Sequence, residues 1–183
     1  LPSTFIDCAN LADQDNDVSY WGGIIAQADG NAAIQREYVL EDCYNSAELK
    51  ARGNVAGLVA NAGFSNNPMR IVRCYNTGNI TAQGTVGTAS GLFGTVGRFS
   101  HISDCYNTGD IISRATASKT NGAIGGIAVM SAPGMQILGC RNSGAIINTN
   151  AKQAYAAGIL AYYKTGGTVA APVLVADCHN TGD

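Results

Sequence analysis

The sequence is poor in charged residues. Only 13% of its 183 residues are Asp, Glu, Lys or Arg, about half the usual share. The 13 acidic and 11 basic side chains leave a net charge of −2, so the chain lacks the basic surface of nucleic-acid-binding and membrane-surface proteins. No apolar run approaches 18 residues, so no membrane span is predicted, and Leu1-Pro2 does not begin a signal peptide.

Lys, Glu and Leu are also few, whereas glycine, Asn, Thr and Ser are abundant. Gly accounts for 23 of the 183 residues, against an average near 7%, which argues against a helical bundle. The apolar share of 46% is still large enough for a core and argues against global disorder. The length predicts a single domain or repeat array over residues 1–183. Its abrupt start and end lead us to expect a piece of a longer protein.

Six cysteines recur at intervals of 31 to 38 residues, and each lies in a near-copy of one phrase. The copies read DCANLAD, DCYNSAE, RCYNTGN, DCYNTGD, GCRNSGA and DCHNTGD. The cysteines are Cys8, Cys43, Cys74, Cys105, Cys140 and Cys178. An Asn follows two residues after each of them, at Asn10, Asn45, Asn76, Asn107, Asn142 and Asn180. A period near 34 that covers almost the whole chain is typical of a solenoid.

Two further apolar segments recur in every copy. One is a glycine phrase such as WGGIIAQ or ASGLFGT, with a shared glycine at 23, 57, 91, 126 and 158. The other precedes each Cys, as in YVLED or MRIVR. All are four to seven residues long and are bounded by turn-forming residues, which favours strands. We therefore predict an all-β, right-handed parallel β-helix of about five coils, each about 34 residues long with three short strands.

Equivalent residues of stacked coils would form ladders along the solenoid. Strand alternation places Cys and Asn on one face and the residue between them on the other. Because cysteine is among the most buried residue types, we predict that the Cys ladder faces the core as free thiols. Disulfides between neighbouring coils are the alternative. The Asn side chains would hydrogen-bond along their ladder and begin a turn in which Asn or Gly adopts the left-handed conformation.

The phrases resemble a known family. GLVA at 57–60 and GLFG at 91–94, alternating with CYNTG at 74–78 and 105–109, are similar to the GLUG-motif repeats. These repeats occur in bacterial surface proteins, including large adhesins and the non-catalytic parts of immunoglobulin A peptidases. The resemblance implies an extracellular bacterial β-solenoid and transfers no catalytic residue. The first copy departs most, because Ala9 replaces the tyrosine and Leu11-Ala12 replaces Thr-Gly, so we expect an altered coil or cap there.

Several acidic residues could carry chemistry. Asp13, Asp15 and Asp17 form D-x-D-x-D, which resembles the start of a calcium loop but lacks its glycine and final glutamate. A solvated acidic turn is the alternative. Asp42 and Asp104 would lie two coils apart, about 9.6 Å from each other at the strand spacing, which suits an inverting glycosidase.

Those two carboxylates also have a structural interpretation, because Arg73 would lie between them and neutralise both. Zinc is disfavoured, since no C-x₂-C pair is present and the two histidines, His101 and His179, occupy unrelated repeat positions. No nucleotide-binding or hydrolase motif is found.

The residue that follows each Cys would point outward. These residues form a predicted strip on successive coils: Tyr44, Tyr75, Tyr106, Arg141 and His179. Rows of exposed rings are frequent binding surfaces for sugars or protein partners. Packing of the rings on one another for stability is the alternative.

These patterns lead to three functional hypotheses. The first is a non-enzymatic bacterial surface or adhesin module, a rigid stalk or ligand-binding scaffold, with no cofactor and with a host glycan or surface protein as partner. The second is a carbohydrate-active β-helix enzyme of the lyase or hydrolase type. The third is an assembly module that associates end to end. Regular coils and sparse charge favour the first, because an enzyme should interrupt its repeat with a charged cluster.

Overall fold

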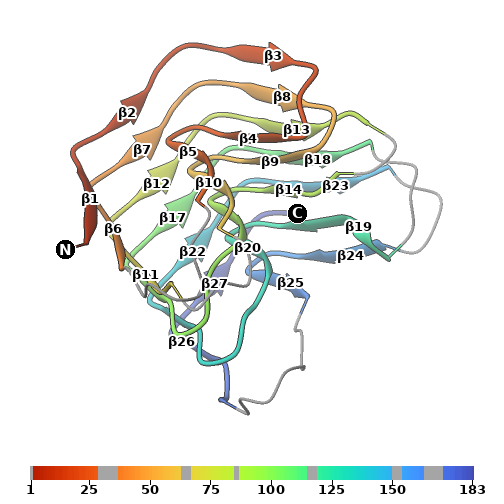
Figure 1. Cartoon of the computed structure of the whole chain (residues 1–183). Coiled ribbons are helices and arrows are strands. Elements are labelled where there is room, and N and C mark those ends of the chain that lie inside the picture. Colours follow the sequence, from red (N-terminus) through yellow and green to blue (C-terminus); the bar gives the residue numbers. More distant parts are fainter. Residues whose placement is uncertain are drawn as a thin grey trace.

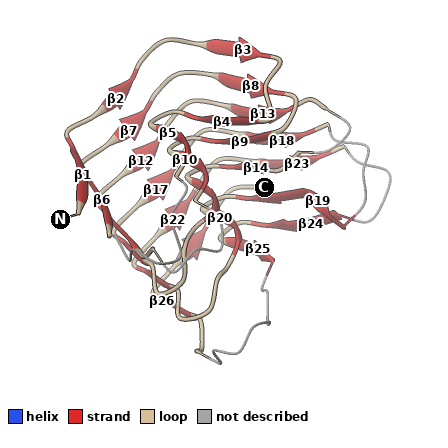
Figure 2. Cartoon of the chain, in the orientation of Figure 1, coloured by secondary structure: helices blue, strands red, loops and turns tan. Residues whose placement is uncertain are grey.

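The computed structural model describes residues 2–28, 37–62, 67–84, 87–114, 119–149, 154–162 and 171–183. Over these ranges the chain contains strands and turns but no helix (Figure 2). Accordingly, none of the described segments is a helix long and apolar enough to cross a membrane. The strands form five parallel sheets, A to E, in which neighbouring strands come from successive coils.

Sheets A, B and C surround each cysteine phrase. Sheet A contains the strands before each Cys: β1 (Ser3–Ile6), β6 (Tyr38–Glu41), β11 (Met69–Val72), β16 (His101–Ser103), β21 (Gln136–Leu138) and β26 (Leu174–Ala176). Sheet B contains the two-residue strands after each Cys: β2 (Ala9–Asn10), β7 (Tyr44–Asn45), β12 (Tyr75–Asn76), β17 (Tyr106–Asn107), β22 (Arg141–Asn142) and β27 (His179–Asn180). Sheet C follows the next turn: β3 (Gln14–Asn16), β8 (Leu49–Ala51), β13 (Ile80–Ala82), β18 (Ile111–Ser113) and β23 (Ile146–Asn148).

Sheets D and E come from the glycine phrases. Sheet D contains β4 (Tyr20–Gly22), β9 (Asn54–Ala56), β14 (Ala89–Ser90), β19 (Lys119–Gly125) and β24 (Ala154–Ala157). Sheet E contains β5 (Ile25–Gln27), β10 (Val59–Asn61), β15 (Phe93–Thr95), β20 (Ala128–Met130) and β25 (Leu160–Tyr162). Each of the five coils contributes one strand to every sheet, and β26 and β27 begin a sixth coil (Figure 1).

This arrangement confirms the predicted all-β parallel solenoid with a period near 34 residues. Each coil, however, holds five strands rather than the three predicted. The glycine phrase bends at its shared glycine, so that Gly57 and Leu58 separate a sheet D strand from a sheet E strand. The sheet C strands escape a search for apolar segments because each is only three residues long and includes polar or small residues, as in Leu49-Lys50-Ala51.

The interior contains two apolar clusters. The larger one joins sheet A to sheet E, where the buried ladder of Leu40, Ile71 and Ile102 packs with Leu58 and Phe93. The smaller one joins sheets C and D and includes Leu49, Ile80, Ile111, Val55 and Ile124. Full burial of each such side chain contributes about 1.5–3 kcal/mol to folding. Because the cluster residues occupy the same register position in successive coils, the apolar side chains of each coil pack on those of the next.

A left-handed residue stands at one corner of every coil. The residues before the six cysteines all have φ between 51° and 62°: Asp7, Asp42, Arg73, Asp104, Gly139 and Asp177. This corrects the expectation that the left-handed conformation falls in the Asn-Thr-Gly turn. Asp, like Asn and Gly, tolerates this region better than most residues, which explains why Asp occupies four of the six corners.

Candidate functional site

The asparagines of sheet B form one continuous hydrogen-bonded ladder. The Nδ2 of each Asn donates to the Oδ1 of the Asn in the next coil at 2.7 Å, from Asn10 through to Asn180. From the second coil onward, the same Nδ2 also donates to the backbone carbonyl two residues ahead, at 2.7–3.1 Å. The four middle members are fully buried. The ladder therefore satisfies turn carbonyls inside the solenoid.

The shared glycines pack directly against this ladder. A Cβ built on Gly57 would lie 2.7 Å from Oδ1 of Asn76 and 2.1 Å from the carbonyl oxygen of Gly91. The shared glycines do not have positive φ, so the close approach of side chain and backbone is what excludes any larger residue. The turn glycines follow the same rule, since a Cβ on Gly78 would lie 1.9 Å from the carbonyl oxygen of Ala47.

The six cysteines line the larger apolar cluster. All are free, and the middle four are buried with at most 1% exposure, whereas Cys8 and Cys178 in the end coils are half-buried. Burial raises the pKa of the Cys43 thiol to about 11 and also raises the pKa of Cys105. These thiols serve as small core residues with weak hydrogen bonds to backbone carbonyls, as from Cys105 Sγ to Ser103 O at 3.1 Å.

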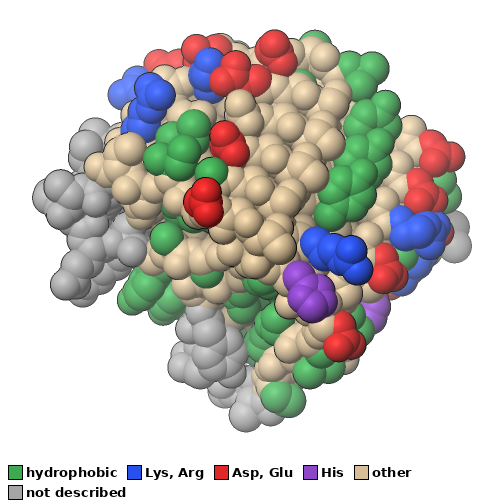
Figure 3. Space-filling model, turned by 180° about the vertical axis from the view of Figure 1, so that it is seen from behind, with side chains coloured by type: hydrophobic (Ala, Val, Ile, Leu, Met, Phe, Trp, Pro, Cys, Tyr) green, Lys and Arg blue, Asp and Glu red, His purple; other side chains and the backbone are tan. Residues whose placement is uncertain are grey.

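The predicted strip lies on the outer face of sheet B in one register. Tyr44 stacks on Tyr75 with ring centroids 4.9 Å apart and planes 6° apart, and Tyr75 stacks on Tyr106 at 4.8 Å and 2°. Arg141 and His179 occupy the next two register positions, and both are exposed. Figure 3 shows a column of hydrophobic side chains that continues into cationic and histidine side chains. The tyrosines therefore both pack on one another and present a surface.

A groove of about 600 Å³ begins where the tyrosine stack ends. One wall is formed by Tyr106, Arg141 and His179, and the other by the exposed hydroxyl residues Thr108, Ser143 and Thr181. Desolvation raises the pKa of the Tyr106 phenol, and the neighbouring Tyr75 adds to the shift. The hydroxyl row was not singled out from the sequence, although its signal is present: the residue after each ladder Asn is Ser or Thr in five copies.

The carboxylates considered for catalysis do not converge. Arg73 donates to Asp42 through Nε at 2.8 Å and Nη2 at 2.9 Å, and it also pairs with Glu41. These hydrogen bonds lower the pKa of both acids. Over the described residues no ion pair joins Arg73 to Asp104, so the expected neutralisation of both aspartates is wrong. The reason is that Glu41 offers Arg73 a second carboxylate on the same side as Asp42.

Asp13, Asp15 and Asp17 each engage a different protein group. Asp13 Oδ1 accepts from the backbone N–H of Glu48 at 2.8 Å, and Asp15 Oδ1 accepts from Gln83 Nε2 at 3.2 Å. Asp17 pairs with Arg52 at 3.0 Å. In the described part of the chain, no three His, Cys, Asp or Glu side chains gather in a way that could hold a metal ion. The histidines also lie apart, with His101 in sheet A beside Gln136 and His179 in sheet B.

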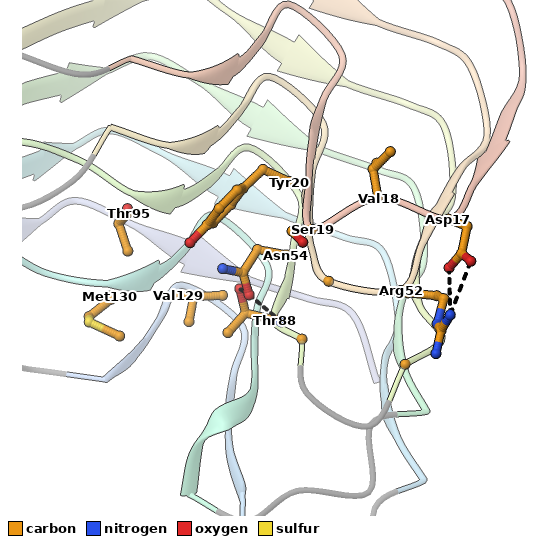
Figure 4. A pocket seen from close by; sticks show the side chains of 13 residues that line it. Asp17, Val18, Ser19, Tyr20, Arg52, Asn54, Thr88, Thr95, Val129 and Met130 are labelled. Atoms are coloured by element: carbon orange, nitrogen blue, oxygen red, sulfur yellow. Dashed lines mark hydrogen bonds and ion pairs between the residues drawn. The ribbon is translucent and has the colours of Figure 1, made fainter.

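A second hollow of about 560 Å³ lies beside the strands of sheets D and E (Figure 4). Tyr20, Asn54, Thr88, Thr95 and Met130 are among its lining residues. Asn54 Oδ1 accepts from both the N–H and the hydroxyl of Thr88, at 3.0 and 3.1 Å. Sequence patterns do not predict this hollow, because its lining side chains differ from coil to coil. Among its described lining residues, the charged ones are Asp17 and Arg52, and they neutralise one another.

Fold and site together define a β-solenoid repeat protein. It has a buried Asn ladder, a buried Cys ladder and an outward-facing strip of aromatic and cationic side chains. Family models, curated proteins and solved structures were all compared with the chain, and none of them matches. The resemblance to the GLUG-motif repeats therefore stays a prediction.

Proposed function

We propose that this chain is a non-enzymatic, extracellular bacterial surface module of the adhesin type, which acts as a rigid scaffold. It binds a host glycan or surface protein through the strip formed by Tyr44, Tyr75, Tyr106, Arg141 and His179. The observation that carries the proposal is the outward-facing strip, half-buried at Tyr44 and Tyr75 and exposed from Tyr106 onward, on a scaffold held in register by buried ladders. Backbone that is fixed coil by coil presents side chains at a constant spacing, which lowers the entropic cost of binding a ligand.

The carboxylates support a binding role over catalysis. A glycosidase needs one carboxyl group that remains protonated near neutral pH, which requires a raised pKa. Here the pKa values of Glu41 and Asp42 both move downward, because Arg73 stabilises their charged forms. The carbohydrate-active enzyme remains the alternative, and it predicts cleavage of a polysaccharide rather than retention of it.

The test is a binding screen of the purified chain against a glycan array and a panel of host surface proteins, run beside a reducing-sugar and unsaturated-product assay. We expect saturable binding without product formation, and surface labelling of intact source cells by an antibody against the chain. Polysaccharide turnover, or the absence of binding to every array member, would contradict the proposal.

End-to-end self-association is a second proposal, favoured by the polarity of the Asn ladder. All its side-chain bonds run in one direction, so Asn10 retains an acceptor toward a preceding coil while Asn180 retains a donor N–H toward a following one. Analytical ultracentrifugation of wild type and Asn180→Asp chains over a concentration series tests it, because Asp keeps the acceptor for Asn142 and loses the free donor N–H, so the variant should self-associate more weakly. Concentration-independent monomers for the wild type would contradict it.

A further inference from the structure

The tyrosine stack ends at the groove, where Tyr106 is its last ring. Tyr75 has a ring on each face, whereas Tyr106 has Tyr75 on one face and Arg141 at the next register position on the other. Tyr106 is 39% exposed, and it lines the groove together with Arg141 and His179. The exposed part of an aromatic ring offers an apolar surface against which a pyranose ring can pack.

Arg141 lacks the ion pair that three other arginines form. Arg52, Arg70 and Arg73 all form ion pairs, but no hydrogen bond or ion pair of the Arg141 guanidinium occurs within the described ranges. Asp104 lines a smaller hollow of about 270 Å³ on the far side of Arg141 and Tyr106. The side of Arg141 that faces the groove is therefore available to an anion, and the neighbouring His179 adds a ring nitrogen there.

The opposite wall supplies hydroxyl groups at the spacing of the coils. Thr108, Ser143 and Thr181 are exposed and follow Tyr106, Arg141 and His179 by two residues, so the two rows run side by side. Hydroxyl groups can donate to or accept from sugar hydroxyls. The planar guanidinium of an arginine binds a carboxylate through two parallel hydrogen bonds.

We propose that this groove binds the carboxylate-bearing pyranose of an acidic saccharide, with the sugar ring against the exposed part of Tyr106 and its carboxylate on Arg141. The inference rests on the proposed binding function and names its ligand class. Charge complementarity decides for an acidic sugar over a neutral one, because a neutral ligand leaves the Arg141 charge partly desolvated without a partner.

The experiment is isothermal titration of the full chain with tetragalacturonate and with its fully methyl-esterified form, which keeps the rings and removes the charge. We expect the acidic form to bind at least tenfold more tightly and to weaken as salt rises from 50 to 500 mM. A sulfated, carboxylate-free oligosaccharide and a poly-glutamate peptide complete the set, and both should bind more weakly than tetragalacturonate.

Variants separate the groove from the rest of the surface. Arg141→Gln and Tyr106→Ser should each weaken tetragalacturonate binding at least tenfold. Arg114→Gln removes an equal charge from another exposed residue, and Tyr155→Ser removes an exposed stacked ring that lies outside the strip; both should stay within twofold of wild type. Tyr106→Phe keeps the platform and should bind like wild type, which covers the case in which Tyr106→Ser misfolds.

Three results would overturn the inference: equal affinity for the esterified form, unchanged affinity of Arg141→Gln, or stronger binding of the sulfated probe or poly-glutamate. Each of these results is compatible with the proposed binding function and contradicts only the proposed ligand class. Failure of the proposed function instead gives no binding to any member of the glycan and protein panels, so the two failures are distinguishable.

Discussion

Gly91 lies directly against the side chain of Asn107 in the next coil: a Cβ on Gly91 would be 2.5 Å from Asn107 Cγ and 2.0 Å from the carbonyl oxygen of Gly126. The glycine phrase and the cysteine phrase, which recur independently along the sequence, thus meet inside the solenoid. The contact recurs in the neighbouring coils, where Gly57 faces Asn76 and Gly126 faces Asn142. The shared glycines and the ladder asparagines recur at matching intervals because each glycine leaves room for the Asn side chain of the next coil.

The first prediction concerns Gly91→Ala. The added methyl group cannot fit without a shift of two backbones, so we expect a loss of about 1–3 kcal/mol or more in the free energy of unfolding. Urea titration followed by circular dichroism measures it. Gly139→Asn is the control, because Gly139 occupies a corner where other coils carry Asp. Equal stability of Gly91→Ala and wild type would contradict the contact.

The second prediction concerns the Asn ladder. Asn76→Ala leaves Asn107 Oδ1 and the Gly78 carbonyl without the Asn76 donor and removes one of the two acceptors of Asn45 Nδ2, at a cost of about 1–3 kcal/mol for each unsatisfied buried group. Asn180→Ala removes the same side chain from an exposed ladder end and should cost much less. Thermal melts of both variants decide the matter, and similar melting temperatures would count against the ladder as a stabilising element.

The third prediction concerns the left-handed corner. Asp104 has φ = 55°, and a β-branched residue tolerates this region poorly, so Asp104→Val should lose about 1–2 kcal/mol. Asp104→Asn removes the charge but keeps tolerance of the left-handed region, and we expect its stability to remain within about 0.5 kcal/mol of wild type. If Asp104→Val and Asp104→Asn prove equally stable in urea titration, then tolerance of the left-handed conformation does not explain the Asp at this position.

The fourth prediction concerns thiol reactivity. Cys8 and Cys178 should label first with a thiol reagent at pH 8, since they are half-buried. Cys43, with its pKa near 11, and the other buried thiols should label only as the solenoid opens, and six thiols should react in denaturant. Mass spectrometry of labelled peptides gives the order. Labelling of Cys74 as fast as that of Cys8 would contradict the inward position of the ladder.

The fifth prediction concerns pH. Arg73 lowers the folded-state pKa of Asp42 and Glu41 below their ordinary values of 3.8 and 4.5. Stabilisation by these pairs is therefore complete above those ordinary values and is lost as pH falls through the lowered ones. Wild type should melt at a higher temperature than Arg73→Gln at pH 7, and the difference should shrink as pH falls below 3.8. A constant difference across this range would show that Arg73 stabilises the fold by another route.

Periodicity alone predicts much of this protein. The period near 34 predicts stacked coils, and the alternation of two along Cys-Tyr-Asn-Thr predicts that Cys and Asn face inward while Tyr faces outward. These inferences succeed because a strand has only two faces and because burying one residue type fixes the position of its neighbours. The stacking of Tyr44, Tyr75 and Tyr106 follows from that register.

Tertiary structure decided what local pattern could not. The left-handed corner before each Cys, the choice of Glu41 over Asp104 by Arg73, and the contact of Gly91 with Asn107 all depend on how a coil closes and how its register falls on the next. The groove also required the structure, because it exists only where Tyr106 ends a stack and Arg141 takes the following register position. Sequence thus determined which side chains share a face, and only coil closure determined which of them touch.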